Sequence, residues 1–551
     1  NFFLRTTHNA LRTTLSFPPS HTETDMPKVL ISDDLSETAV NIFKERGVEV
    51  AYEPKLGKDK AKLEQVIGLY DGLAVRSATK ATAAIIAAGK KLKVIGRAGI
   101  GVDNIDIPAA TAAGIVVMNT PYGNAITTAE HAIAMMFAAA RQIPLANAST
   151  HAGKWEKTRF MGVELYGKTL GVIGCGNIGG IVADRGVALK MRVIAFDPYL
   201  TDARAVELGV EKVELDALLA RADIITLHTP LTEQTKNILS AKALAKTKKG
   251  VIIVNCARGG LLDEAALKAG LDAGKIGAAA LDVFATEPAT DHPLFGNDKV
   301  VLTPHLGAST NEAQENVAIQ IAEQMADYLT RGAVTNALNM PSITAEEAPR
   351  LKPFISLAEN LGKFAGQLTE TSVKAIEVVY AGNVAKLNTR PMTAAAVAGV
   401  LRPMLAEVNI VNAPLIAKER GIAIAETYRD DAENFESVIR LRIVTERQDR
   451  TVSGALFGQT PRIVEIKGVE MEASFASNML YVTNADKPGF IGALGQTLGA
   501  AAVNIATFNL GRSGPGADAI ALLAVDEPVS DEVLEKVSKL PHVKQAKSLK
   551  F

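Results

Sequence analysis

Three charged side chains in the middle of the chain are of the types that oxidation of a 2-hydroxy acid requires. They are Arg258 in "VNCARGG", Glu287 in "LDVFATEP" and His305 in "LTPHLGAST". A guanidinium can bind a substrate carboxylate through two hydrogen bonds and polarise the adjoining carbonyl. An imidazole can take the hydroxyl proton while hydride leaves, and a carboxylate paired with it orients the ring and favours its protonated form. Each of the three follows a predicted strand, which is where parallel α/β sheets place ligands.

Each of these residues also has an ordinary structural explanation. Arg258 stands beside two glycines and fits a loop arginine, Glu287 precedes a proline and fits a solvated turn, and His305 fits a core or loop histidine. Spacing along the chain cannot bring the three side chains together. Their convergence in space is therefore the central prediction of the sequence.

The segment "TLGVIGCGNIG" predicts a dinucleotide-binding turn. Gly174, Gly176 and Gly179 give the spacing G-x-G-x-x-G, directly after a predicted strand and at the start of a predicted helix. The first glycine makes the tight turn, the second admits pyrophosphate close to the backbone, and the third packs helix on strand. The helix N-terminus offers unpaired N–H groups, and we expect Asn177 and Ile178 to donate theirs.

Asp197 indicates which dinucleotide binds. It ends the next predicted strand in "RVIAFDP", about 18 residues after the third glycine. A carboxylate there accepts hydrogen bonds from the adenosine ribose and repels a 2'-phosphate, so the expected cofactor is NAD rather than NADP. The alternative is a glycine-rich turn followed by a capping aspartate.

Short apolar runs, alternating with alanine-rich helical stretches, predict the elements that must position these residues. Strands buried on both faces are continuous apolar runs, and their alternation with helices indicates parallel βαβ units. Eleven runs are too many for one sheet, so the predicted fold class is α/β with two doubly wound parallel-sheet domains. The runs cover residues 28–32, 48–52, 72–76, 92–96, 115–118, 169–174, 192–196, 223–227, 250–255, 277–282 and 299–303.

Beyond these runs the pattern changes twice. Residues 330–350 lack periodicity and are rich in Pro, Asn and Thr, which predicts a linker. The following 350–475 are mixed α and β and carry no catalytic motif that we recognise. Residues 478–551 follow the order βαββαβ, which predicts a small α+β unit with a split-βαβ sheet.

The first 25 residues have an unusual composition. They begin with Asn, carry Arg5 and Arg12 among many Ser and Thr, and hold no acid before Glu23. This is typical of an organelle transit peptide. We favour the alternative, a disordered leader or upstream extension, because Met26 stands just before the first predicted strand.

Composition argues against several classes of function. Apolar residues make up 48% and charged residues 22%, and the formal net charge is −1, so we expect a folded chain that binds neither nucleic acid nor membrane. No apolar run approaches the ~18–20 residues that span a bilayer. The two cysteines, Cys175 and Cys256, lack metal-ligand spacing, so we expect no metal site. So few cysteines indicate a reducing, cytoplasmic location, or an organelle if residues 1–25 are a transit peptide.

Longer motifs resemble the D-isomer-specific 2-hydroxyacid dehydrogenase family. They include "GLAVRSATKAT", "GRAGIGVDNID", "NTPYGNAITTAEH", "LHTPLT" and "PHLGAST", and the resemblance runs from Lys28 to the C-terminus. It is strongest to the long members that oxidise D-3-phosphoglycerate with NAD, the first step of phosphorylated serine biosynthesis. It implies a flavodoxin-like substrate domain at 26–122 and 310–340, a Rossmann NAD domain at 123–309, an allosteric substrate-binding-like domain at 345–475 and a regulatory domain at 478–551.

The resemblance also implies roles for single residues. His305 would be the proton donor and acceptor, Glu287 its partner, and Arg258 the residue that binds the substrate carboxylate. Substrate contacts would fall at Arg76, Ser77, Asn124 and Arg258. Cofactor contacts would fall at Thr79, Gly174, Gly176, Asn177, Ile178, Gly179, Asp197, Thr229, Cys256, Ala257, Arg258, Asp282, His305, Leu306, Gly307 and Ala308. Asn177 stands where many relatives carry Arg, so we expect somewhat weaker cofactor affinity.

The C-terminal unit, with "NADKPGFIG" before its first helix, resembles an ACT domain, a small effector-binding module. Asp486 and Asn504 fall where serine-binding relatives contact the effector, and Asn484 replaces the Tyr or His of some relatives. L-serine is therefore an expected effector. Because ACT modules commonly bind effectors between paired copies, the resemblance implies a homo-oligomer, with a tetramer expected.

Other functions remain open at this point. Arg76, Lys80 and Arg97 could form a phosphate-binding cluster, or each could be a solvated cation. A glycerate or hydroxypyruvate reductase or a formate dehydrogenase would share the motifs, although such relatives generally lack the long tail. A non-catalytic regulator that senses NAD or an amino acid would share the fold.

Overall fold

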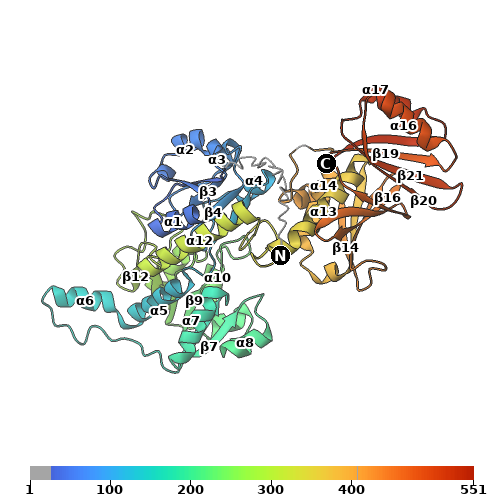
Figure 1. Cartoon of the computed structure of the whole chain (residues 1–551). Coiled ribbons are helices and arrows are strands. Elements are labelled where there is room, and N and C mark those ends of the chain that lie inside the picture. Colours follow the sequence, from blue (N-terminus) through green and yellow to red (C-terminus); the bar gives the residue numbers. More distant parts are fainter. Residues whose placement is uncertain (1–25, 406) are drawn as a thin grey trace, which may run out of the picture.

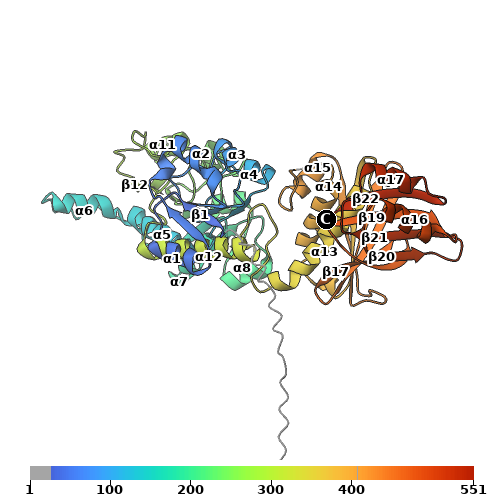
Figure 2. The same cartoon turned by 45° about the horizontal axis from the view of Figure 1, so that its top comes forward.

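The computed structural model describes residues 26–405 and 407–551. Figures 1 and 2 show two lobes, which meet near α13 (Ala348–Gln367); the first holds two sheets of the N-terminal part and the second holds the two remaining sheets. The predicted leader at 1–25 lies outside the described residues. Among the described residues, no helix combines the length and the apolar character needed to cross a bilayer.

The first sheet is parallel and has five strands in the order β2-β1-β3-β4-β5. Its central strands are apolar runs buried on both faces, as in the fully buried GLAV of β3. Helices cover both faces, so the unit is doubly wound. Its strands are β1 (Lys28–Ile31), β2 (Glu49–Tyr52), β3 (Gly72–Val75), β4 (Val94–Arg97) and β5 (Val116–Met118), and its helices are α1 (Glu37–Glu45), α2 (Lys60–Val66), α3 (Ala83–Ala88) and α4 (Ile107–Ala112).

The second sheet is also parallel, with seven strands in the order β12-β11-β10-β9-β6-β7-β8. Six of them lie at the predicted apolar runs. The seventh, β8 (Glu211–Lys212), was missed because it is two exposed polar residues at the sheet edge. The others are β6 (Thr169–Ile173), β7 (Arg192–Phe196), β9 (Ile224–Leu227), β10 (Val251–Asn255), β11 (Ile276–Leu281) and β12 (Val300–Leu302), with helices α5 (Ala125–Arg141), α6 (Ile143–His151), α7 (Asn177–Ala188), α8 (Asp202–Leu208), α9 (Leu215–Arg221), α10 (Ala241–Lys246) and α11 (Glu264–Asp272).

The chain crosses between these two sheets twice. It leaves the first sheet after β5 and returns with α12 (Asn311–Arg331), whose buried residues pack on the first sheet. Arg46, the residue that follows α1, fixes this return through ion pairs of 2.6 Å to Asp327 and 2.9 Å to Glu323. The segment after α12 is irregular, as expected of a linker, but it is packed rather than loose. Asn339 accepts a hydrogen bond from the amide of Val117 and holds the segment against β5.

The third sheet has six strands in the order β14-β13-β15-β16-β17-β18 and mixes parallel and antiparallel pairs. The helices α13 and α14 (Arg390–Leu401) pack on one of its faces, and α14 is buried from Pro391 onward. α15 (Ala413–Glu419) follows. The strands are β13 (Val373–Gly382), β14 (Ala423–Arg429), β15 (Ser437–Thr445), β16 (Asp449–Phe457), β17 (Thr460–Ile466) and β18 (Val469–Ser474).

The fourth sheet is antiparallel in the order β20-β21-β19-β22 and follows the predicted βαββαβ path. Its elements are β19 (Asn478–Ala485), α16 (Phe490–Ala500), β20 (Ile505–Arg512), β21 (Asp518–Val525), α17 (Asp531–Ser538) and β22 (Val543–Lys550). The face away from these two helices packs toward α13, where the rings of Phe364 and Tyr481 lie 5.8 Å apart, edge to face. The predicted fold class, two parallel α/β sheets followed by mixed α+β units, is confirmed.

One hydrophobic core joins the first sheet to the C-terminal lobe. It runs from one face of the first sheet through α12 and α13 to the fourth sheet, and includes residues as distant as Val29 and Leu549. The second sheet has separate cores on its two faces, around Val172 and around Ile253. The second sheet thus lies outside the core that joins the other three sheets.

Candidate active site

His305 and Glu287 lie together in the structure. They follow β12 and β11, which are neighbours in the sheet, and His305 Nδ1 lies 2.7 Å from Glu287 Oε2. The other carboxylate oxygen accepts the amide of Phe284 at 3.0 Å, which fixes the plane of the carboxylate. With Nδ1 held by Glu287, the second ring nitrogen, Nε2, remains for a substrate proton.

A cleft of about 740 Å³ brings this pair opposite the first sheet. Arg76 and Ser77 follow β3 and line one side, whereas Glu287 and His305 line the other. Arg97, at the end of β4, also lines it. Lys80, which could have joined the cation cluster, is exposed and lies outside the lining of the cleft.

Arg97 makes the cleft a site for an anion. Burial, and then repulsion from Arg258 and Arg76, lowers the pKa of its guanidinium to about 10. Its Nε is buried and finds no hydrogen-bond partner among the described residues. Crowded, partly desolvated cations of this kind are stabilised by a bound carboxylate or phosphate.

Arg258 belongs to the same cation cluster and pairs with an acidic residue that the sequence did not single out. Its Nε donates to Asp103 at 2.8 Å, and Nη1 donates to the carbonyl of Ala257. Asp103 lies in the loop after β4, so the pair bridges the two sheet domains. The structure thus holds Arg258 against Asp103 and not against His305 or Glu287.

The glycine-rich turn has the geometry that pyrophosphate requires. Gly174 has φ +88°, and a Cβ on Gly179 would lie 1.9 Å from the carbonyl oxygen of Gly174. No atom lies within 4 Å of the corresponding position on Gly176, which opens the turn at the start of α7. No side chain caps this helix N-terminus, so its N–H groups are free for phosphate oxygens.

The remaining predicted cofactor residues differ in how well they are placed. Asp197 follows β7 and accepts the amides of Cys175 and Tyr199, each at 2.8 Å, so its carboxylate is fixed beside the turn. Ile178 lies in the first turn of α7, where its amide is available. Thr229, Cys256 and Ala257 follow β9 and β10 at the same sheet edge, and Leu306, Gly307 and Ala308 follow His305. These residues fit a bound nicotinamide dinucleotide.

Four further predicted residues are buried or contact protein groups. Thr79 is fully buried in the first domain, where its hydroxyl donates to Asp33 at 2.7 Å. Asn177 donates its side-chain amide to the carbonyl of Pro121 at 3.2 Å, while its backbone amide, the predicted donor, lies at the start of α7. Asp282 is fully buried and bound by protein donors. Asn124 is buried, and its Oδ1 is left without a partner among the described residues.

Sequence reasoning did not single out Asp103, Asp33 or His131. Asp33 accepts the amides of Arg76 and Thr79 and so shapes the loop that carries Arg76. His131 contacts Asp282. The acid in "GVDNID" and the histidine in "TTAEH" were visible in the quoted motifs, but nothing local indicated their partners.

The expected effector residues do not form one site within a single chain. Asp486 pairs with Arg512 at 2.9 Å and accepts the amide of Gly516, whereas Asn504 donates to Asp526 at 2.6 Å. These contacts lie at opposite ends of the eight-residue β21, roughly 20 Å apart at ~3.3 Å per residue. Asn484 is buried, with its Oδ1 unpartnered among the described residues.

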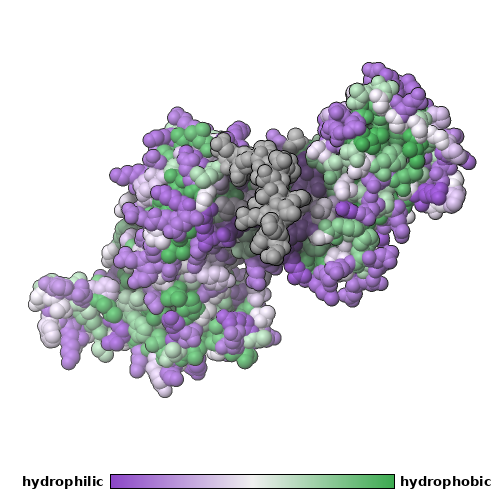
Figure 3. Space-filling view, viewed as in Figure 1, coloured by the Kyte–Doolittle hydropathy of each residue, from purple (hydrophilic) through white to green (hydrophobic). Residues whose placement is uncertain are grey.

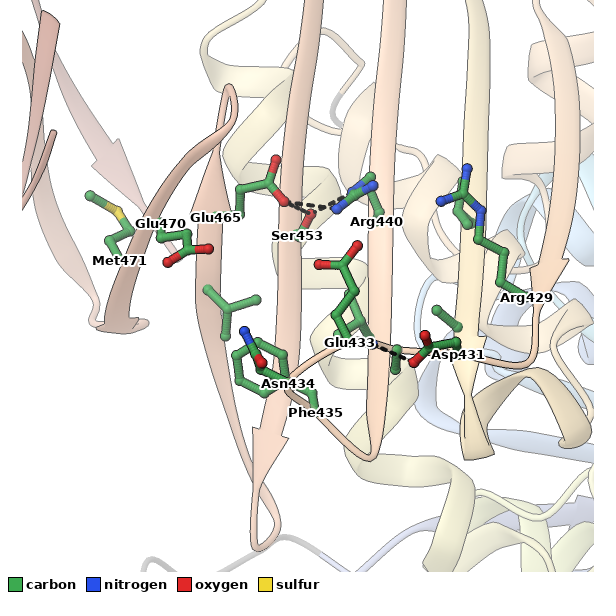
Figure 4. Close-up of a pocket in the computed structure, with 15 residues that line it drawn as sticks. Arg429, Asp431, Glu433, Asn434, Phe435, Arg440, Ser453, Glu465, Glu470 and Met471 are labelled. Carbon is green, nitrogen blue, oxygen red and sulfur yellow. Dashed lines mark hydrogen bonds and ion pairs between the residues drawn. The ribbon is translucent and has the colours of Figure 1, made fainter. Parts of the chain in front are cut away.

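A second hollow, of about 340 Å³, lies on the third sheet (Figure 4). Arg440 donates to Ser453 and to Glu465 on its floor, while Glu433 and Arg429 stand at its margin. Its lining holds neither histidine nor cysteine. Across the described residues there is no group of three or more His, Cys, Asp or Glu placed to hold a metal ion.

Fold and site together define a two-domain dehydrogenase that uses a nicotinamide dinucleotide. Residues 133–307 match the D-isomer specific 2-hydroxyacid dehydrogenase NAD binding domain, 350–467 match the D-3-phosphoglycerate dehydrogenase intervening domain, and 478–542 match the ACT domain. A glyoxylate reductase from Paecilomyes thermophila superposes with TM-score 0.53 and 32% identity, and the match covers 57% of this chain and 98% of that one.

Longer relatives match most of the chain. D-3-phosphoglycerate dehydrogenase of Archaeoglobus fulgidus is 44% identical over 93% of this chain and 98% of its own length. That of Bacillus subtilis is 40% identical over 95% of this chain and 99% of its own. The chain therefore belongs to the D-3-phosphoglycerate dehydrogenase family of the D-isomer-specific 2-hydroxyacid dehydrogenases.

Proposed function

We propose that this protein oxidises D-3-phosphoglycerate to 3-phosphohydroxypyruvate with NAD, with His305 as general base. The contact of 2.7 Å between His305 and Glu287, in a cleft also lined by Arg76 and Arg97, carries the proposal. A phosphorylated hydroxy acid brings two anionic groups to a cleft with several cations.

The chain's own residues divide the work of the reaction. Arg76 and Arg97 bind the phosphate, with Ser77 and Asn124 as further contacts, and Arg258 exchanges Asp103 for the substrate carboxylate. His305 Nε2 takes the hydroxyl proton, and Glu287 holds the ring and stabilises the resulting imidazolium. A nicotinamide held at this sheet edge would supply the hydride acceptor.

NAD is the proposed form of the cofactor. The pyrophosphate would lie against Gly176 and the amides of Asn177 and Ile178, with Asp197 at the adenosine ribose. The fixed carboxylate of Asp197 supports this choice, since it would repel a 2'-phosphate.

The test of the proposed activity is an assay of NAD reduction with D-3-phosphoglycerate, glycerate, lactate, 2-hydroxyglutarate and formate. We expect turnover with D-3-phosphoglycerate well above the others. His305→Ala should lower kcat by about 10²–10⁴-fold, while NAD affinity, measured by calorimetry, stays close to that of the wild type. Ordinary turnover in that variant would remove the mechanism.

We further propose that L-serine inhibits the enzyme through the ACT domain, and that Asp486 and Asn504 of two paired copies complete its site. Their separation within one chain supports a site shared between copies. Asn504→Ala should weaken serine inhibition without changing kcat in its absence. Unchanged inhibition in both Asn504→Ala and Asp486→Ala would refute this site.

A homotetramer is the proposed assembly. α6 projects from the first lobe (Figures 1 and 2), and the segment that follows it exposes Trp155 by 87%, Met161 by 77% and Tyr166 by 72%. Figure 3 shows a second hydrophobic area on the other lobe, where α16 exposes Ile491. Two separate apolar surfaces support two kinds of subunit contact. Light scattering after size-exclusion chromatography measures the mass, and a monomer would refute the proposal.

A reducing, cytoplasmic location is the last part of the proposal. Cys175 and Cys256 are free and buried, and burial raises the pKa of the Cys175 thiol to about 11, which keeps it unreactive. Cell fractionation with antibody detection tests it, and recovery with an organelle would contradict it.

A further inference from the structure

The carboxylate of Asp282 is the point at which the segment carrying His305 is attached to the sheet. Asp282 follows β11 and has no exposed surface. It accepts the hydroxyl of Thr303 at 2.6 Å, the amide of Leu306 at 2.7 Å and the amide of Gly307 at 2.8 Å. These three donors lie on both sides of His305 in the chain.

His305 needs such an attachment because of its own backbone. Its φ is +57°, in the left-handed region, which residues other than glycine adopt only when their surroundings hold them there. Without the two amide contacts to Asp282, the backbone would be free to relax, and the imidazole would leave Glu287.

A carboxylate buried away from water is stabilised by each further hydrogen bond that it accepts. His131, on α5, lies with Nε2 at 3.2 Å from Asp282 Oδ1 and at 3.2 Å from Thr303 Oγ1. Burial disfavours the ionised carboxylate, but the hydrogen bonds from His131, Thr303 and Leu306 outweigh it and hold the pKa of Asp282 below its usual value.

We propose that His131 is a positioning residue for the dehydrogenase reaction: through Asp282, it holds residues 303–307 in the conformation that places His305 beside Glu287. The inference rests on the proposed role of His305. His131 lies beneath this segment on the helix that follows the first chain crossing, so it acts only through Asp282 and Thr303.

Hydrogen exchange tests the attachment without any need for activity. In the full chain we compare His131→Leu, which removes the donor, with His131→Gln, which keeps an N–H donor the same number of bonds from Cα. The control is Glu130→Gln, an exposed neighbour on the same helix. We expect amide exchange in residues 303–308 to rise about tenfold in His131→Leu and to stay near wild type in the other two.

Steady-state kinetics with D-3-phosphoglycerate and NAD test the consequence for catalysis. A misplaced imidazole should lower kcat by about 10²-fold in His131→Leu, with little change in either KM, and His131→Gln should restore most of it. Thr303→Val, which removes another donor to Asp282, should give the same pattern more weakly. If His131→Leu does not fold, the Thr303→Val variant tests whether the contacts to Asp282 position His305.

Unchanged amide exchange in His131→Leu, or faster exchange with unchanged kcat, would overturn the positioning role of His131. A change confined to the KM for NAD would also overturn it. A wild-type protein that turns over none of the hydroxy acids would instead refute the proposed function, while the exchange data would still decide whether His131 holds the segment.

Discussion

At the scale of single residues, the carboxylates of the dinucleotide domain are fixed by backbone amides before any ligand binds. Asp197 accepts two amides, Glu287 accepts one and pairs with His305, and Asp282 accepts two. Carboxylates held in this way lose little conformational entropy when a ligand binds, so less of their electrostatic interaction energy with the ligand is offset. Replacing such an aspartate by asparagine removes the charge but keeps one hydrogen-bond acceptor, and so measures the effect of the charge alone.

Asp197→Asn should shift the cofactor preference toward NADP. The amide oxygen can still accept one of the two backbone amides, but the repulsion of a 2'-phosphate is gone. Like charges ~4 Å apart repel by about 1 kcal/mol even in bulk water, so we expect the ratio of kcat/KM for NADP to that for NAD to rise about fivefold to tenfold. Steady-state assays with both cofactors measure it. The exposed Asp202→Asn on α8 is the control, and an unaltered ratio would show that Asp197 does not face the ribose.

The residues of the site that the sequence could predict are those whose role is set by neighbours in the chain. Gly174, Gly176 and Gly179 act together within one turn, so their spacing alone indicates their function. Asp103 lies 155 positions from Arg258, and His131 is 172 positions from Thr303. Contacts over such separations depend on how the sheets are placed, which no local pattern expresses.

At the scale of elements, the buried parallel strands were predictable because a strand covered on both faces must be apolar throughout. The edge strand β8 carries no such pattern, and the segment after α12 has no periodicity although it is well packed. β8 is held by its pairing with β7, and the segment after α12 is held by its contact with β5, so the sequence of neither segment predicts its conformation. Arg450, at the start of β16, is charged and would be expected at the surface from its type, but it is buried.

Arg450→Met should stabilise the protein. Arg450 is only 4% exposed, and none of its three side-chain nitrogens finds a hydrogen-bond partner among the described residues. Burial lowers the pKa of its guanidinium, and burial raises the pKa of the nearby Tyr481 to about 12. Replacing an unpaired buried charge by an apolar side chain of similar length should raise the free energy of unfolding by about 1–4 kcal/mol.

Urea unfolding followed by circular dichroism measures this change. The control is Arg442→Met on β15, an exposed arginine paired with Glu377 and Asp449, for which we expect a loss of about 0–1 kcal/mol. A less stable Arg450→Met protein would mean that the guanidinium has a partner that the structure does not contain.

At the scale of the whole molecule, stability should fall on acidification in part through His228, which follows β9 beside the glycine-rich turn. Burial lowers the pKa of this histidine to about 4, against ~6.5 in an unfolded chain. The unfolded state therefore binds a proton first, so the contribution of neutral His228 is complete above pH ~6.5 and is lost as the pH falls toward 4.

His228→Gln should reduce this loss. We expect the free energy of unfolding to fall less steeply between pH 6.5 and 4.5 than in the wild type, by about 1 kcal/mol per pH unit. Urea titrations at several pH values measure the slope. His151→Gln, at an exposed histidine on α6, should leave it unchanged, and equal slopes in all three proteins would contradict the assignment.

The continuous core has a consequence for how the protein melts. Since the first sheet, α12, α13 and the fourth sheet share one core while the second sheet has its own, we expect scanning calorimetry to resolve two heat-absorption peaks. NAD should move mainly one of them to higher temperature, because a ligand stabilises the unit that holds most of its contacts. A single peak that shifts as a whole would mean that the cofactor domain unfolds cooperatively with the other domains, although it does not share their hydrophobic core.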